Sequence, residues 1–207
     1  FSGLSLNILP GRVLLISGEN GSGKSSFLRI VAGLLTPASG KILWKDKDIS
    51  LDLDTHHRRS VFIGHANPVK AIMTVRENLE FWANLNNLKT DIDIALNKFD
   101  LNKQADVPAR YLSAGQCRRL VLARLVIINQ LTDPPPIWIL DEPAAGVDPT
   151  ATNTLAFLVI TSHAFFLQAE EPSFKLTFGS NLGNIPFEIN KINKNKKELS
   201  GIKINSW

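Results

Sequence analysis

The chain has 207 residues, of which 44% are hydrophobic and 20% are charged, as is ordinary for a globular protein built around one core. The best candidate for a membrane span, residues 120–128, is too short and is interrupted by Arg124, and no secretory signal pattern opens the chain. The single cysteine, Cys117, excludes an internal disulfide framework and fits a reducing compartment. We expect the natural protein to begin upstream of Phe1.

The net charge of +4 comes from the end of the chain. Residues 191–207 contain five lysines and one acidic residue, Glu198, so the remainder is neutral. A nucleic-acid-binding protein would carry its basic stripe on the folded body, and we therefore expect no nucleic-acid partner. We interpret residues 191–207 as a solvated or disordered polar tail after a single domain at 1–190. Contact of this tail with an anionic membrane surface is the alternative.

The first predicted element is the apolar segment 13–17, which reads as a strand and leads into a glycine-rich loop and an amphipathic helix with Phe27, Leu28, Val31, Leu34 and Leu35 on one face. The loop matches G-x-x-x-x-G-K-[ST], whose backbone N–H groups and helix N-terminus bind phosphates. Lys24 is expected on the β- and γ-phosphates, and Ser25 as a ligand of Mg²⁺. The predicted nucleotide-binding residues here are Gly18, Glu19, Asn20, Gly21, Ser22, Gly23, Lys24, Ser25 and Ser26.

Residues 40–49 read as a β-hairpin with Asp46 in its turn, because aspartate tolerates a left-handed backbone. His56 and His57, beside two arginines, are predicted to lie in a solvated loop. The segment V-F-I-G-H at 61–65 carries a further histidine, His65. The neutral imidazole of His65 either hydrogen-bonds a nucleophilic or metal-bound water or has only a packing role.

Two amphipathic helices follow. Thr74 precedes the first, and Glu77 stands three residues later, which is the pattern of a capping box. The second is predicted at 91–101. After them, L-S-A-G-Q at 112–116 begins a long apolar helix whose N-terminal donors suit an anion. Because the chain already has one phosphate loop, we interpret this second anion-binding helix N-terminus as a site for the nucleotide of another copy. The sequence thus predicts a homodimer with two nucleotides at its interface.

Residues 137–140 form an apolar run typical of a central parallel strand, and Asp141 and Glu142 follow it directly. Ligands bind at the carboxyl ends of strands in open α/β sheets, so both carboxylates are expected beside the phosphate loop. Asp141 is predicted to hold Mg²⁺, and Glu142 to orient and deprotonate the attacking water.

These motifs together resemble the ATP-binding-cassette ATPases. L-S-A-G-Q is similar to the family signature L-S-G-G-Q, 18–25 to the Walker A motif and 137–142 to the Walker B motif. Residues 145–148 resemble the D-loop and 161–163 the segment of the switch histidine. The resemblance covers about residues 1–165. It implies an α/β P-loop NTPase fold with a RecA-like core, an antiparallel β lobe, and a helical lobe at about 70–125 that contacts the membrane subunit.

The resemblance also assigns residue roles. It makes Glu142, His163 and His65 catalytic and Ser25 and Asp141 ligands of Mg²⁺. It adds four residues to the ATP-binding set: Ser113, Gly115, Gln116 and Asp148. His65 stands where most relatives have glutamine, and this feature, with the sequence around the signature and Walker B motifs, is similar to the heme-exporter ATP-binding subunits of cytochrome c maturation.

Only fourteen residues separate Asp148 from His163, about half of what the family usually has. A crossover between parallel strands normally needs a dozen residues or more, so His163 either just reaches the γ-phosphate or is kept from it.

The leading hypothesis is an ATPase subunit that drives export, bound peripherally to the cytoplasmic face of a bacterial inner membrane or the matrix face of a mitochondrial one. Its partners would be integral membrane subunits. The alternatives are the ATPase of another exporter, a cassette protein that acts on DNA or ribosomes, and a degenerate subunit that binds ATP without hydrolysis.

Overall fold

The computed structural model describes residues 2–8, 12–17, 21–87, 90–131, 137–143, 145–151, 154, 174–177, 188–193 and 198–202. The chain divides into two compact units. The sheet unit comprises Phe1–Val61, Pro136–Ile139 and His163–Trp207, and the helical unit comprises Phe62–Pro135 and Leu140–Ser162.

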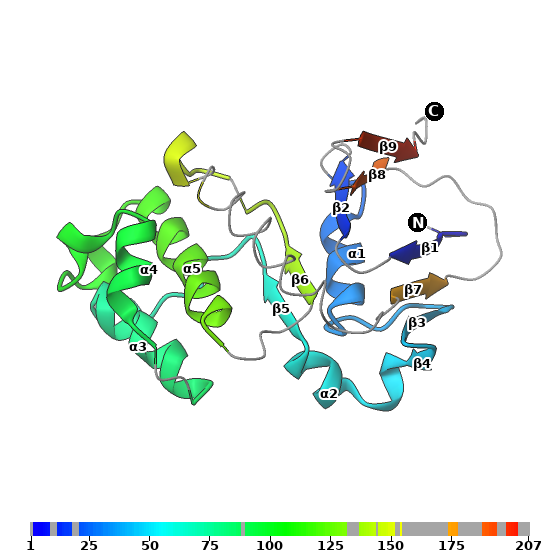
Figure 1. Ribbon diagram of the computed structural model, residues 1–207, viewed down its shortest axis with the longest axis horizontal. Coiled ribbons are helices and arrows are strands. Elements are labelled where there is room, and N and C mark those ends of the chain that lie inside the picture. The colour runs from blue at the N-terminus through cyan, green and yellow to red at the C-terminus, as the bar shows by residue number, and fades with distance from the viewer. Residues whose placement is uncertain are drawn as a thin grey trace. The chain divides into compact units, whose positions relative to one another are not determined.

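A four-stranded antiparallel sheet forms part of the sheet unit, in the order β1-β7-β3-β4 (Figure 1). Its strands are β1 (Ser5–Ile8), β7 (Phe174–Thr177), β3 (Lys41–Trp44) and β4 (Lys47–Asp48). The predicted hairpin is confirmed, with φ of 49° at Lys45 and 61° at Asp46. Two successive left-handed residues are the mark of a tight hairpin turn. Asp46 was expected to adopt this backbone, whereas Lys45 was not.

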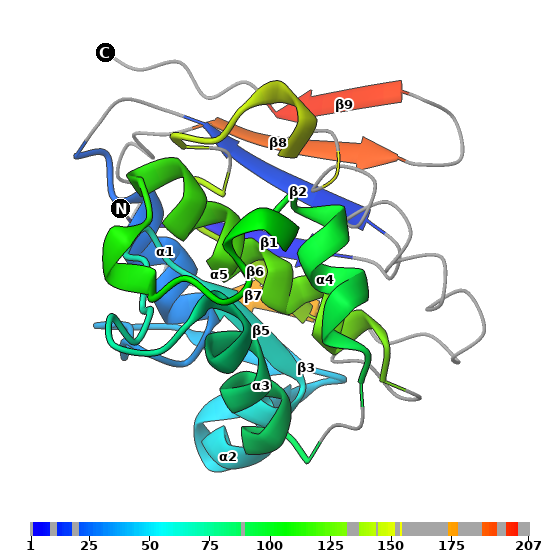
Figure 2. The ribbon, with the colours of Figure 1, turned by 90° about the vertical axis from the view of Figure 1, so that its left-hand side faces the viewer.

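The strand before the phosphate loop, β2 (Arg12–Ser17), belongs to a second sheet with β8 (Glu188–Asn193) and β9 (Glu198–Ile202). Figure 2 shows the three strands side by side. Apolar residues occupy matching register positions: Ile16 is opposite Ile189, and Ile189 is opposite Ile202. Within the polar tail expected at 191–207, the structure thus describes strand residues at 191–193 and 198–202.

The helix that follows the phosphate loop, α1 (Lys24–Val31), buries Phe27, Ile30 and Val31. It ends before Leu34 and Leu35, which are exposed, so their predicted place on its apolar face is wrong. The turn at Gly33, whose φ is 72°, ends the helical pattern early. Beyond β4 the chain forms the 3₁₀ turn η1 (Ile49–Leu51) and the short helix α2 (Leu53–Arg58), capped by Asp48 and Asp52 respectively.

Strands β5 (Ser60–Ile63) and β6 (Ile137–Leu140) pair with each other, and the chain passes between the units along both. In the sheet unit the N–H of Ile137 donates to the carbonyl of Arg59 at 3.1 Å. In the helical unit the N–H of Asp141 donates to the carbonyl of Ile63 at 2.8 Å. From the first bond to the second, the residue number increases by four on each strand. The two strands therefore run parallel, as expected for the strand before the carboxylates.

The helical unit is built on α3 (Val75–Leu85), α4 (Ile92–Lys98) and α5 (Ala114–Asn129), with the 3₁₀ turns η2 (Asn102–Gln104) and η3 (Ala109–Tyr111) between the last two (Figure 1). Helix α5 contacts both α3 and α4, and each of the three helices buries apolar side chains, among them Leu79, Leu96 and Leu122. The predicted capping box is confirmed: Thr74 Oγ1 accepts from the N–H of Glu77, and Glu77 accepts from the N–H of Thr74. None of the helices in the described part of the chain combines the length and hydrophobicity of a bilayer-spanning helix.

His56 was predicted to lie in a solvated loop, and this is wrong. It is on α2, fully buried, with Nε2 2.9 Å from the carbonyl oxygen of Val31 at the end of α1. The imidazole fills space that an added Cβ on Gly33 would enter, at 3.3 Å from His56 Cδ2. Burial lowers the pKa of His56, because the charged imidazolium loses its hydration. The residue is a structural link between α1 and α2.

The lowered pKa of His56 makes stability depend on pH. Between the folded-state pKa and the unfolded value of about 6.5, only the unfolded chain takes up this proton. The free energy of unfolding should therefore fall as pH drops below about 6.5, by at most about 1.4 kcal/mol per pH unit from this group. Urea unfolding of wild type and His56→Gln between pH 5.5 and 8 would give the free energy of unfolding against pH for each protein. The difference between these two curves is the contribution of His56. His57→Gln, which changes the exposed neighbour, should keep the wild-type slope. A pH-independent difference for His56→Gln would contradict the assignment.

Candidate functional site

The phosphate loop lies in the sheet unit, and the structure describes it from Gly21 onward. Gly18, Glu19 and Asn20 are outside the described residues. Gly21 and Gly23 have φ of 84° and 94°, a backbone that residues with a side chain rarely adopt. Gly23 is the N-cap of α1 and supplies no side-chain hydrogen bond to it. The N-terminal N–H groups of α1 are thus suited to an external anion.

Ser22 gives an independent indication of an anion at this loop. Its Oγ is buried and has no hydrogen-bond partner within the part of the chain that the structure describes. A buried hydroxyl without a partner is costly unless a ligand satisfies it. Lys24 and Ser25, in the first turn of α1, are half-buried, and Ser26 is exposed. These residues fit a phosphate group.

The two carboxylates follow β6 in the helical unit and differ in environment. Asp141 is buried, whereas the side chain of Glu142 is 47% exposed. Glu142 also has a left-handed backbone, with φ of 48°, which costs a residue other than glycine about 1 kcal/mol or more. A buried carboxylate suits a cation, and an accessible one suits a water molecule.

His65 and Glu142 come together in the structure. His65 Nδ1 is 3.4 Å from Glu142 Oε2, and the imidazole is 73% exposed. They are 77 positions apart in the sequence, and the pairing of β5 with β6 brings them near each other. An imidazole in this position can orient the carboxylate or share a water with it.

Sequence reasoning missed Arg118, the second-turn residue of α5 that is buried beside both carboxylate-bearing positions. Its guanidinium donates five hydrogen bonds, to the carbonyls of Gly64, Asp141, Glu142 and Pro143 and to Asn67 Oδ1, at 2.8–3.3 Å. Burial lowers the pKa of Arg118, while the negative charges of Asp141 and Glu142 act in the opposite direction. The available signal was its spacing: Arg118 stands four and seven residues before the buried Leu122 and Leu125.

The signature segment begins α5 with a capping box. Ser113 Oγ accepts from the N–H of Gln116, and Gln116 Oε1 accepts from the N–H of Ser113. These bonds use acceptor atoms, so the Ser113 hydroxyl proton and the Gln116 amide N–H groups can still donate to a ligand.

The D-loop segment lies against the start of α5. A Cβ added to Gly115 would be 2.8 Å from the carbonyl oxygen of Gly146. Asp148 accepts from the N–H of Ala151 and from Arg119, at 3.0 and 3.4 Å. The bond from Ala151 lowers the pKa of Asp148. Within its own chain Asp148 is therefore a helix cap and an ion-pair partner, whereas the sequence predicted a nucleotide contact.

The predicted site residues are divided between the two units. The phosphate loop belongs to the sheet unit, and the helical unit brings together His65, Asp141, Glu142, the signature segment and Asp148. His163 lies outside the described residues, so its reach toward a γ-phosphate stays a prediction.

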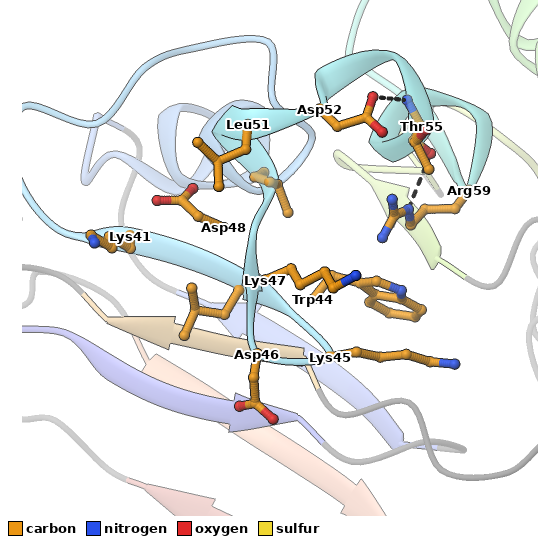
Figure 3. Close-up of a pocket in the computed structure, with 12 residues that line it drawn as sticks. Lys41, Trp44, Lys45, Asp46, Lys47, Asp48, Leu51, Asp52, Thr55 and Arg59 are labelled. Carbon is orange, nitrogen blue, oxygen red and sulfur yellow. Dashed lines mark hydrogen bonds between the residues drawn. The ribbon is translucent and has the colours of Figure 1, made fainter.

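A depression of about 670 Å³ on the sheet unit contains none of the predicted site residues. The β3–β4 hairpin and α2 line it (Figure 3), and the Arg59 guanidinium lies 5.5 Å from the centre of the Trp44 ring. Asp48 and Asp52 there accept hydrogen bonds from the turns that they cap. These two carboxylates thus serve local structure.

Comparison with known proteins decides the family. The family model described as ABC transporter matches residues 1–145. The chain belongs to this family. As an ABC protein it is 42% identical, over 79% of its length, to a cytochrome c biogenesis ATP-binding export protein CcmA of Rhodospirillum rubrum, and it covers 69% of that relative. The CcmA protein of Yersinia pestis is 38% identical over 93% of this chain and 84% of its own length.

Solved structures agree on the fold. A structure titled as the ATP binding subunit of an ABC transporter is similar with a TM-score of 0.61 and 23% identity, over 72% of this chain and 62% of that one. The predicted α/β P-loop NTPase fold and the predicted ABC family are both confirmed. The chain spans less than two thirds of that solved protein.

The contact between Gly115 and Gly146 predicts the effect of one methyl group. Helix propensity alone would make Gly115→Ala more stable by up to about 1 kcal/mol. A Cβ at 2.8 Å from a backbone oxygen instead forces the D-loop segment away, and overpacking of this kind costs about 1–3 kcal/mol. We expect a net loss of stability in denaturant unfolding, with slower ATP hydrolysis. A variant more stable than wild type would show that the two segments are not in contact.

Proposed function

We propose that this chain is the nucleotide-binding subunit of an ABC transporter and hydrolyses ATP to drive export, most plainly in the heme-export system of cytochrome c maturation. Membership of the ABC family and the similarity to CcmA proteins support this function. The single observation that carries hydrolysis is the pair formed by Glu142 and His65 at the end of β6. An accessible carboxylate beside an imidazole is the arrangement that activates a water.

The residues divide the work as follows. The N-terminus of α1 and Lys24 bind the phosphates of ATP, and Ser25 and Asp141 hold Mg²⁺. When bound, the metal ion neutralises phosphate charge during transfer of the phosphoryl group. Glu142 accepts the proton of the attacking water, and His65 orients Glu142. His163 is assigned to the γ-phosphate by its resemblance to the switch histidine.

Two copies of the chain would act together. Ser113, Gly115 and Gln116 would bind the nucleotide held by the other copy, with Asp148 at the same interface. Integral membrane subunits are the proposed partners, and the place of action is the inner membrane, at its cytoplasmic face in bacteria or its matrix face in mitochondria. The identity of the membrane subunits would decide which molecule is exported.

The Glu142→Gln variant tests hydrolysis. Glutamine retains hydrogen bonding to a water but cannot take its proton, so ATP binding should persist while turnover falls by at least about 100-fold. Lys24→Ala is the matched comparison, since loss of the ammonium should weaken ATP binding itself. Steady-state hydrolysis and nucleotide-binding titrations measure both effects. Wild-type ATP binding without hydrolysis would identify a non-hydrolysing subunit, and near-normal turnover of Glu142→Gln would remove the proposed base.

The Ser113→Arg variant tests the composite dimer. If Ser113 serves the partner's nucleotide, an isolated chain carrying this change should bind ATP with wild-type affinity while hydrolysis is lost. Mixing Ser113→Arg chains with Lys24→Ala chains gives dimers in which both defects lie at one site and the other site is intact. Such mixtures should bind one ATP per dimer. Loss of ATP affinity in the isolated Ser113→Arg chain would place Ser113 at its own nucleotide and contradict the dimer.

A further inference from the structure

Arg118 forms as many hydrogen bonds as its guanidinium has N–H donors. This side chain has five N–H donors and no acceptor. Nε donates to Pro143, one terminal nitrogen donates to Gly64 and Asn67, and the other donates to Asp141 and Glu142. The side chain is 3% exposed, so these five acceptors replace its water. Four of the five are main-chain carbonyls, which makes the contact sensitive to backbone conformation rather than to neighbouring side chains.

Three of these carbonyls are consecutive and belong to the turn that carries the proposed catalytic carboxylate. Residues 141–143 leave β6, and the middle one, Glu142, has the left-handed backbone described above. Such a conformation persists only where the surroundings over-determine it. Arg118 binds the carbonyl of Glu142 at 2.8 Å, and the carboxylate of Glu142 faces His65.

The same guanidinium also binds the loop that carries His65. Its bond to the carbonyl of Gly64 is 2.8 Å long, and this residue immediately precedes His65. Arg118 thus fixes both partners of the Glu142–His65 pair through their main chains. Because Arg118 lies five residues after Ser113, it connects them to the helix that begins with the signature segment.

We propose that Arg118 is a positioning residue for hydrolysis, which sets the place of Glu142 and His65 and links them to the signature helix of the same chain. This inference rests on the proposed function. A nucleotide of the partner that engages Ser113 would then act on α5, and Arg118 would carry that engagement to the water-activating pair of its own chain. Hydrolysis at one site would in this way respond to occupation of the other.

The kinetic test uses Arg118→Lys and Arg118→Gln in the natural protein with MgATP. Lysine keeps the positive charge but has three donors in place of five, and glutamine has two. We expect kcat to fall on the order of 10–100-fold in Arg118→Gln, with Arg118→Lys between it and wild type, because a misplaced catalytic group costs about that much. The KM for ATP should change less than about 3-fold, since the phosphate-binding residues are untouched. Arg76→Gln is the matched control, because it removes an arginine of the helical unit that pairs with Asp93 on α4.

Hydrogen exchange of backbone amides supplies a readout without turnover. In both Arg118 variants without nucleotide, peptides covering 139–146 and 62–67 should exchange faster, while peptides covering 75–85 keep wild-type protection. Unchanged exchange at 139–146, or a wild-type kcat in Arg118→Gln, would overturn the proposal. Failure of both variants to fold would also overturn it, by assigning Arg118 to the fold. Absence of hydrolysis in the wild type would instead count against the proposed function, and the exchange measurement would still decide the role of Arg118.

Discussion

The buried guanidinium of Arg118 donates to five neutral acceptors. These bonds hold residues 64–67 and 141–143 of the helical unit in place. Burying a charge is costly unless every donor is satisfied, and Arg118 meets this condition with four carbonyls and one amide oxygen. The carbonyls belong to two segments that follow different strands, β5 and β6. Neither segment has enough regular structure of its own to fix its path. The position of Glu142 relative to His65 therefore depends on a residue that touches neither of their side-chain functional groups in the described contacts.

The first two turns of α5 combine structural contacts with hydrogen-bond donors that the proposed function assigns to a nucleotide. Gly115, Arg118 and Arg119 are three and four residues apart, so they share one face, and all three contact residues 141–148. Ser113 and Gln116 close the helix N-terminus with their acceptor atoms and retain their donors. A change at Ser113 or Gln116 would therefore alter the capping of α5 as well as its ability to donate to a ligand.

Local sequence patterns predicted the helices and turns, whereas the burial of two polar residues depends on contacts between distant parts of the sequence. The Thr74 capping box, the hairpin turn at Asp46 and the helix after the phosphate loop follow from residues within a few positions of each other, and the structure confirms them. The buried His56 and Arg118 bind partners 23–54 residues away, so local patterns did not predict their contacts, although the helical spacing of Arg118 to Leu122 and Leu125 was a signal of its burial. The ordered motifs sufficed for the family, whereas the contact between His65 and Glu142 required the pairing of β5 with β6.

The left-handed backbone of Glu142 has a consequence for how this protein tolerates change. Glycine and asparagine adopt such a backbone more readily than glutamate does, so the residue best suited to the turn is not the one best suited to accept a proton. Stability and catalysis therefore favour different residues at one position. Under the proposed function, glycine or asparagine at this position would give a folded chain that keeps the turn but lacks the base for hydrolysis.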